Sequence, residues 1–108
     1  MNVLILEENL MWSSRLKSGV TGLGHNATVV SSPLESFPLP DVAIVNLGSR
    51  AFAATEWIPK LQSLGSKVIA HAGHKEKPLL LVGTDSGADV VVTNSELTNK
   101  LESVFARL

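Results

Sequence analysis

Val3-Leu4-Ile5-Leu6-Glu7-Glu8 opens the chain with four apolar residues that are followed directly by two acids. A strand with one wet face alternates apolar and polar residues, and this run does not alternate. Continuous apolar runs of this length are typical of strands buried on both faces, as in a parallel sheet covered by helices. We therefore predict a strand of such a sheet over residues 3–6, with Glu7 and Glu8 at its carboxyl end.

Further apolar runs follow along the chain, and most of them are rich in β-branched residues. They are Ala27–Val30, Val42–Val45, Val68–Ala70 and Val90–Val92. The segments between them mostly read as helices. An alternation of five strands with helices predicts a doubly wound α/β domain with a five-stranded parallel sheet.

The first intervening segment, Asn9–Leu23, shows the helical pattern best. Trp12, Leu16 and Val20 recur every four residues, which places them in one stripe along a helix. Asn9 is a residue type that caps helix N-termini, so we expect the helix to begin there.

The remaining helices are predicted from caps, breakers and apolar spacing. We expect Ser49 to cap a second helix that ends at Gly65, and Ser95 to cap a last helix that runs to the end of the chain. Leu79–Val82 is expected to be a helix that covers the sheet. Ser31–Pro40 contains three prolines, and we expect a loop with at most one turn there.

Length and composition limit the classes of function. The chain has 108 residues, which fits a single domain over residues 1–108. It contains no cysteine, which excludes disulfides, thiolate metal sites and a cysteine nucleophile. A net charge of −1 with scattered Lys and Arg, and few aromatic residues, argue against nucleic-acid binding. No membrane span or signal peptide is visible, so we expect a soluble cytoplasmic domain.

In doubly wound sheets, ligands and chemistry lie at the carboxyl ends of the strands. The polar and small residues at these five ends are therefore the candidate functional positions. They are Glu7–Glu8, Ser31, Asn46, Ala72 and Thr93–Asn94.

The whole chain resembles the receiver domain of bacterial response regulators, the CheY-like family. The matching stretches are residues 3–9 (VLILEEN), 23–30 (LGHNATVV), 40–46 (PDVAIVN) and 87–94 (GADVVVTN). The resemblance implies a flavodoxin-like, three-layer α/β/α fold with strand order 2-1-3-4-5. In this chain the second helix would be short or missing.

The resemblance also assigns roles to strand ends. In active receivers an aspartate ends strand three and accepts a phosphoryl group, an acidic pair after strand one holds a divalent cation, a Ser or Thr ends strand four, and a Lys ends strand five. An aromatic switch residue lies within strand five. The matching positions here are Asn46, the pair Glu7 and Glu8, Ala72, Asn94 and Val91.

These substitutions predict a degenerate phosphorylation pocket with no catalytic residue. The neutral amide of Asn46 is not a competent nucleophile, and its loss of charge removes a hard ligand from a cation. Ala72 offers no hydroxyl, and Asn94 cannot pair with phosphate as a lysine would. We expect no cofactor and no metal, with weak cation binding by Glu7 and Glu8 as the open alternative.

Each of these positions also has a purely structural interpretation. Glu7 and Glu8 could solubilise a strand end and favour the start of the first helix. Asn46 could hydrogen-bond the neighbouring loop, or act as a neutral stand-in that locks one conformation. His71 and His74 lack a third ligand in the sequence, so we expect them at loop or surface positions rather than in a metal site.

The predicted function is that of a pseudo-receiver, which acts in signal transduction through protein–protein contacts without phosphorylation and is not an enzyme. We expect its partner to be another protein or a second copy of the chain. Active receivers commonly signal through helix four, strand five and helix five, which correspond here to Pro78–Val82, the strand containing Val91, and Ser95–Leu108. Because the sequence ends at Leu108, its effect would come from a partner or from a domain outside this sequence.

Two alternatives belong to other classes. The first is a flavodoxin-like module that binds flavin, a nucleotide or cobalamin, although Glu7-Glu8-Asn9 would repel a phosphate after strand one. The second is an unrelated enzyme on this fold, for which no Ser/His/Asp arrangement or nucleophile elbow is visible.

Overall fold

A computed structural model describes all residues, 1–108, as five strands and five helices. The strands are β1 (Asn2–Leu6), β2 (Asn26–Val30), β3 (Val42–Asn46), β4 (Lys67–Ala72) and β5 (Val90–Thr93). The helices are α1 (Leu10–Gly22), α2 (Ala54–Ser63), α3 (Lys77–Asp85), α4 (Asn94–Asn99) and α5 (Leu101–Ala106). No helix has the length and apolar character that crossing a membrane requires.

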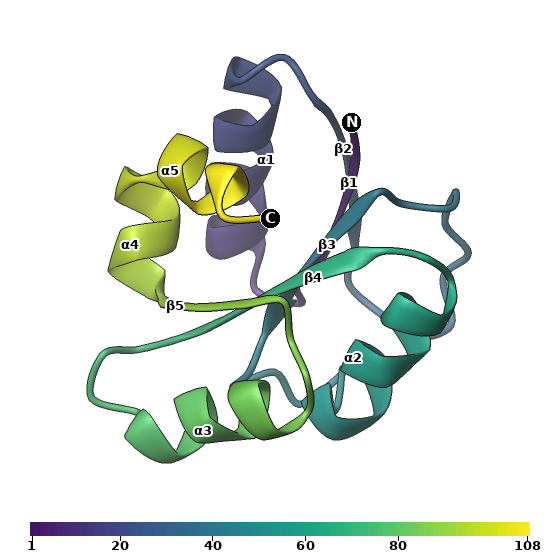
Figure 1. Ribbon diagram of the computed structural model, residues 1–108. Helices are drawn as coiled ribbons and strands as arrows, with labels where there is room; N and C mark the ends of the chain where they lie inside the picture. The colour runs from purple at the N-terminus through teal and green to yellow at the C-terminus, as the bar shows by residue number, and fades with distance from the viewer.

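The strands form one sheet in the order β2-β1-β3-β4-β5, and every neighbouring pair is parallel. Helices α2 and α3 cover one face, and α1, α4 and α5 cover the other (Figure 1). This arrangement confirms the predicted doubly wound, three-layer fold and its 2-1-3-4-5 strand order. The chain between β2 and β3 forms turns and no helix, as its prolines predict.

The sheet separates two apolar cores, because successive side chains of a buried strand point to opposite faces. Leu4 and Leu6 of β1 pack toward α2, where Ile58 and Leu61 are fully buried. Ile5 packs on the other face with Leu16 of α1. This two-sided burial explains why the strands read as unbroken apolar runs.

The helix starts are only partly as predicted. Asn9 caps α1, and its Oδ1 accepts hydrogen bonds from the backbone N–H groups of Met11 and Trp12. The predictions of Ser49 and Ser95 as caps are wrong: α2 begins after Ala53, and Thr93 caps α4 by accepting from the Glu96 N–H at 3.2 Å. Threonine caps as serine does, and Thr93 was overlooked because it was assigned to the end of the strand.

Candidate functional site

The carboxyl ends of β1, β3 and β4 place three polar side chains in one row. Leu6 pairs with Val45, so Glu7 lies level with Asn46, and Asn46 pairs with His71. The alternation along each strand puts all three on the side of Ile5, Ile44 and Ile69, facing α1, α4 and α5. The parallel register therefore assembles this site from residues far apart in the sequence.

Glu7 and Asn46 form the centre of the row. The Asn46 Nδ2 donates to Glu7 Oε1 at 2.9 Å, and the Gly48 N–H donates to Asn46 Oδ1 at 2.9 Å. The Gly48 contact fixes the amide orientation, since a backbone N–H can only face the oxygen. Glu7 is 1% exposed, and its other oxygen accepts from the Asn9 N–H at 3.2 Å. The interpretation of Glu7 as a solubilising residue is therefore wrong, because water does not reach it.

The hydrogen bond of Asn46 to the neighbouring loop is confirmed, and its role as a stand-in that locks one conformation stays a prediction. Its oxygen bonds the loop after β3, and its nitrogen neutralises part of the field of a buried carboxylate. Glu7 thus receives from an amide and a backbone N–H the hydrogen bonds that a buried carboxylate needs.

Glu8, in contrast, is exposed and holds the loop between β3 and α2. It accepts from the Ser49 hydroxyl at 2.6 Å and from the Arg50 N–H at 3.1 Å. Desolvation alone would raise the pKa of Glu8, but the hydrogen bonds from Ser49 and from the backbone outweigh it, so the pKa lies below its ordinary value. The acidic pair is therefore divided, with one carboxylate in the row and the other on the loop.

His71 extends the row toward α4. Its Nδ1 lies 2.6 Å from Asn94 Oδ1, and its ring lies 6.4 Å from that of Trp12. Since the Asn94 oxygen only accepts, this geometry makes Nδ1 a protonated ring nitrogen. Burial lowers the pKa of His71 more strongly than the Asn94 bond raises it.

The prediction that His71 lies in a loop or on the surface is wrong. β4 continues through Ala72, and His71 is 1% exposed, whereas His74 is exposed in the following loop. The available signal was the spacing along the strand. His71 lies two residues after the apolar Ile69, and residues two apart in a strand point to the same face of the sheet.

The remaining predicted positions do not join this row. Ala72 is buried against the α2 and α3 side of the sheet, in the core that contains Ala70. Val91 is half-buried on the same side and packs beside Gly83 of α3. The row therefore contains Glu7, Asn46, His71 and Asn94, and lacks any hydroxyl.

The chemistry available to this row is limited. No group of three or more His, Asp or Glu side chains is arranged to hold a metal ion. The amide of Asn46 carries no nucleophilic oxyanion, and the neutral Asn94 turns its oxygen toward His71. Both oxygens of the buried Glu7 accept hydrogen bonds from the chain itself.

No protein-family profile and no curated protein matches the chain. Solved structures do match. A two-component response regulator from Clostridium difficile aligns with a TM-score of 0.78 at 14% identity, over 99% of this chain and 97% of that one. The chemotaxis response regulator CheY4 of Vibrio cholerae aligns with a TM-score of 0.76 at 14% identity, over 95% and 97% of the two chains.

A third match is a response regulator from Burkholderia pseudomallei, solved with a phosphorylated aspartic acid, a calcium ion and citrate. It aligns with a TM-score of 0.75 at 15% identity, over 95% of this chain and 65% of that one. At these identities the likeness concerns the backbone. The chain thus has the fold of response-regulator receiver domains along nearly its whole length.

Proposed function

We propose that this chain is a pseudo-receiver, a signalling module that works through protein–protein contacts and without phosphorylation. The observation that carries the proposal is the 2.9 Å hydrogen bond from Asn46 Nδ2 to the buried Glu7. In the receiver pattern, these two positions belong to the phosphoacceptor and to the cation-binding acids. Here they satisfy each other.

The chemistry of phosphoryl transfer supports the same conclusion. An acyl phosphate forms when a carboxylate oxygen attacks phosphorus while cations neutralise the phosphoryl oxygens. The solved Burkholderia pseudomallei protein contains a phosphorylated aspartate and a calcium ion. Asn46 has neither the attacking oxyanion nor the charge that would help to hold such a cation, and Ala72 and Asn94 supply no hydroxyl and no ammonium group. We therefore also propose that the domain is not an enzyme; its cytoplasmic location stays a prediction.

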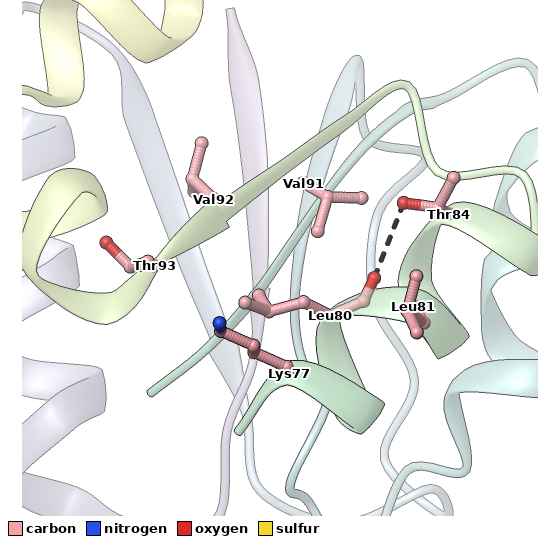
Figure 2. A pocket seen from close by; sticks show the side chains of 7 residues that line it. All are labelled: Lys77, Leu80, Leu81, Thr84, Val91, Val92 and Thr93. Carbon is pink, nitrogen blue, oxygen red and sulfur yellow. Dashed lines mark hydrogen bonds between the residues drawn. The ribbon is translucent and has the colours of Figure 1, made fainter. Parts of the chain in front are cut away.

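The proposed partner surface lies over α3 and β5. A hollow of about 400 Å³ opens between them, with Leu80, Leu81 and Val91 as apolar lining and Lys77 at one end (Figure 2). Leu81 is 62% exposed and lies beside Leu80 and Val91, so these side chains form one apolar patch on the surface. This surface contains the Pro78–Val82 and Val91 parts of the predicted one, whereas the Ser95–Leu108 segment, also predicted to belong to it, does not line the hollow and packs on the other face of the sheet. The apolar character of this surface supports contact with a protein or with a second copy of the chain.

Phosphorylation is tested by incubating the protein with acetyl phosphate and Mg²⁺ and measuring its intact mass. We expect no covalent adduct. Asn46→Asp serves as the matched variant, and it also should remain unmodified because the hydroxyl and the ammonium group are still missing. A stoichiometric phosphoryl adduct on the unaltered chain, stable to acid and labile to base, would refute the proposal.

The partner surface is tested with Leu81→Asp, and Leu34→Asp is the control because Leu34 is 95% exposed on the loop after β2. Light scattering reports the mass in solution. If the second copy is the partner, Leu81→Asp alone should convert a dimer to a monomer. A dimer that survives Leu81→Asp would exclude this surface as its interface.

A further inference from the structure

A second hollow lies beside the row, between α1, α4 and the loop after β4. Its volume is about 350 Å³, and Trp12 is the one hydrophobic residue among the eight that line it. Trp12 and Arg15 contribute from α1, Asn94 and Ser95 from α4, and Gly73 and His74 from the loop. The proposed phosphorylation-independent role does not use this hollow.

Hydrogen-bond donors in this lining are left without partners in the chain. Asn94 Oδ1 is taken by His71 at 2.6 Å, so both N–H groups of its Nδ2 remain available. Ser95 Oγ accepts from Asn99 Nδ2 at 3.3 Å, which leaves its own hydroxyl proton free to donate. The Gly73 N–H, in contrast, already donates to Glu76 at 3.0 Å.

The charge of the lining has one sign. No aspartate or glutamate lines the hollow, and its titratable side chains are Arg15 and His74. The two salt bridges of the chain join Lys67 to Asp89 and Arg107 to Glu96, so Arg15 has no carboxylate partner. Its guanidinium lies 5.9 Å from the centre of the Trp12 ring, which holds this cation at the edge of the hollow.

We propose that this hollow binds a small organic oxyanion, a phosphate ester or a carboxylate. Arg15 would supply the charge-assisted hydrogen bonds, with Asn94 Nδ2 and the Ser95 hydroxyl as additional donors. A volume of about 350 Å³ lies at the small end of the range for ligand sites, and it exceeds what a bare ion fills. The half-buried Trp12 gives the organic part an apolar wall. This inference does not depend on the proposed function, since protein–protein contact through α3 and β5 requires no ligand in this hollow.

The test is an NMR titration of the ¹⁵N-labelled full chain with phenyl phosphate, benzoate and inorganic phosphate in turn. We expect saturable shifts of the Trp12 indole and the Ser95 amide with an organic probe. The tighter of the two organic probes identifies the preferred oxyanion. Absence of saturable shifts with all three probes at millimolar concentration would overturn the proposal, and inorganic phosphate binding as tightly as phenyl phosphate would overturn the role of Trp12.

Arg15→Gln should weaken binding by about tenfold or more, the loss expected for one hydrogen bond to a charged group. Lys17→Gln is the matched control, because it removes the same charge from an exposed position of α1 that does not line the hollow. Equal weakening by the two variants would show general charge attraction and would refute the site. Each spectrum also reports whether the variant folds. Should Arg15→Gln unfold, Ser95→Ala takes its place, and unchanged affinity in that variant would count against the site.

Discussion

Replacing Asn46 by aspartate is the most direct test of how the row is stabilised. In the parent chain, Asn46 Nδ2 donates to Glu7 Oε1 at 2.9 Å, and Glu7 is almost completely buried. Aspartate has the same shape, but it replaces the donor by a second acceptor. The variant therefore loses a hydrogen bond to a charged group, worth about 1.5–3 kcal/mol, and sets two carboxylates against each other.

The size of the repulsion follows from this distance. Two unit charges 2.9 Å apart repel by about 6 kcal/mol at an effective dielectric constant of about 20. The protein can avoid this cost by binding a proton. Protonating a carboxyl with an ordinary pKa near 4 at pH 7 costs about 4 kcal/mol, since each pH unit above the pKa costs about 1.36 kcal/mol. The protonated carboxyl donates to its partner and so replaces the lost hydrogen bond, which leaves the cost of protonation. We therefore expect Asn46→Asp to lower the free energy of unfolding by up to about 4 kcal/mol at pH 7, and by much less near pH 4.5.

Urea unfolding at both pH values measures this difference. The double variant Glu7→Gln with Asn46→Asp is the matched control, because it exchanges the two groups and restores one amide facing one carboxylate. We expect it to recover most of the lost stability at pH 7. If Asn46→Asp is as stable as the parent at pH 7, or if the double variant recovers nothing, the pair does not stabilise the row as described.

Three further outcomes test other parts of the structure. An ordinary histidine has a pKa of about 6.5, and burial lowers the pKa of His71, so the unfolded chain binds a proton more readily than the folded chain. The free energy of unfolding should therefore fall as the pH drops below about 6.5 toward the lowered pKa. His71→Leu should remove this pH dependence, as measured by urea unfolding. Gly83→Ala should lower the free energy of unfolding by about 1–3 kcal/mol, because the new Cβ would lie 3.0 Å from Leu47 Cδ1. Gly22→Ala is the control: its Cβ would meet open space, so stability should stay the same or rise. Thermal unfolding measures both variants. Asn9→Ala should cost about 1 kcal/mol by removing the cap of α1, measured the same way, and an unchanged melting temperature would contradict the capping role.

The fold could be predicted because it depends on patterns that are local in sequence. Each strand is an unbroken apolar run, and the prolines after β2 exclude a helix there. The start of the last helix was predicted wrongly at Ser95, since the path of β5 makes Thr93, which is also a good capping residue, the N-cap of α4. The last helix is also interrupted at Lys100, whose φ of −134° and ψ of 39° divide α4 from α5, and no glycine or proline signals this break.

The sequence predicted which residues lie at the strand ends, but not which of their side chains contact each other. The ends of parallel strands had to meet, so Glu7 and Asn46 were expected near each other. Which of the two acids turns inward depends on the register of β1 against β3, and the sequence does not specify that register. His71 was missed because the strand was expected to end at Ala70, which left the histidine in a loop. Two more residues of β4 bring it into the core beside Asn94.

The balance of charge in the row supports the proposed loss of cation binding. In the receiver pattern, several carboxylates gather at the strand ends, and a divalent cation must compensate their repulsion. Here the buried part of the row contains one carboxylate, Glu7, and an amide and a backbone N–H donate to it. Asn94, which we propose to correspond to the receiver lysine, carries no charge, and its oxygen lies 2.6 Å from the His71 ring nitrogen. Under the proposed correspondence of Asn46 with the receiver aspartate and of Asn94 with the receiver lysine, one negative and one positive charge are lost together, so each change offsets the electrostatic cost of the other. A reversal of Asn46 alone would restore the negative charge without its counter-charge, which is why we expect it to destabilise the fold and not to restore phosphorylation.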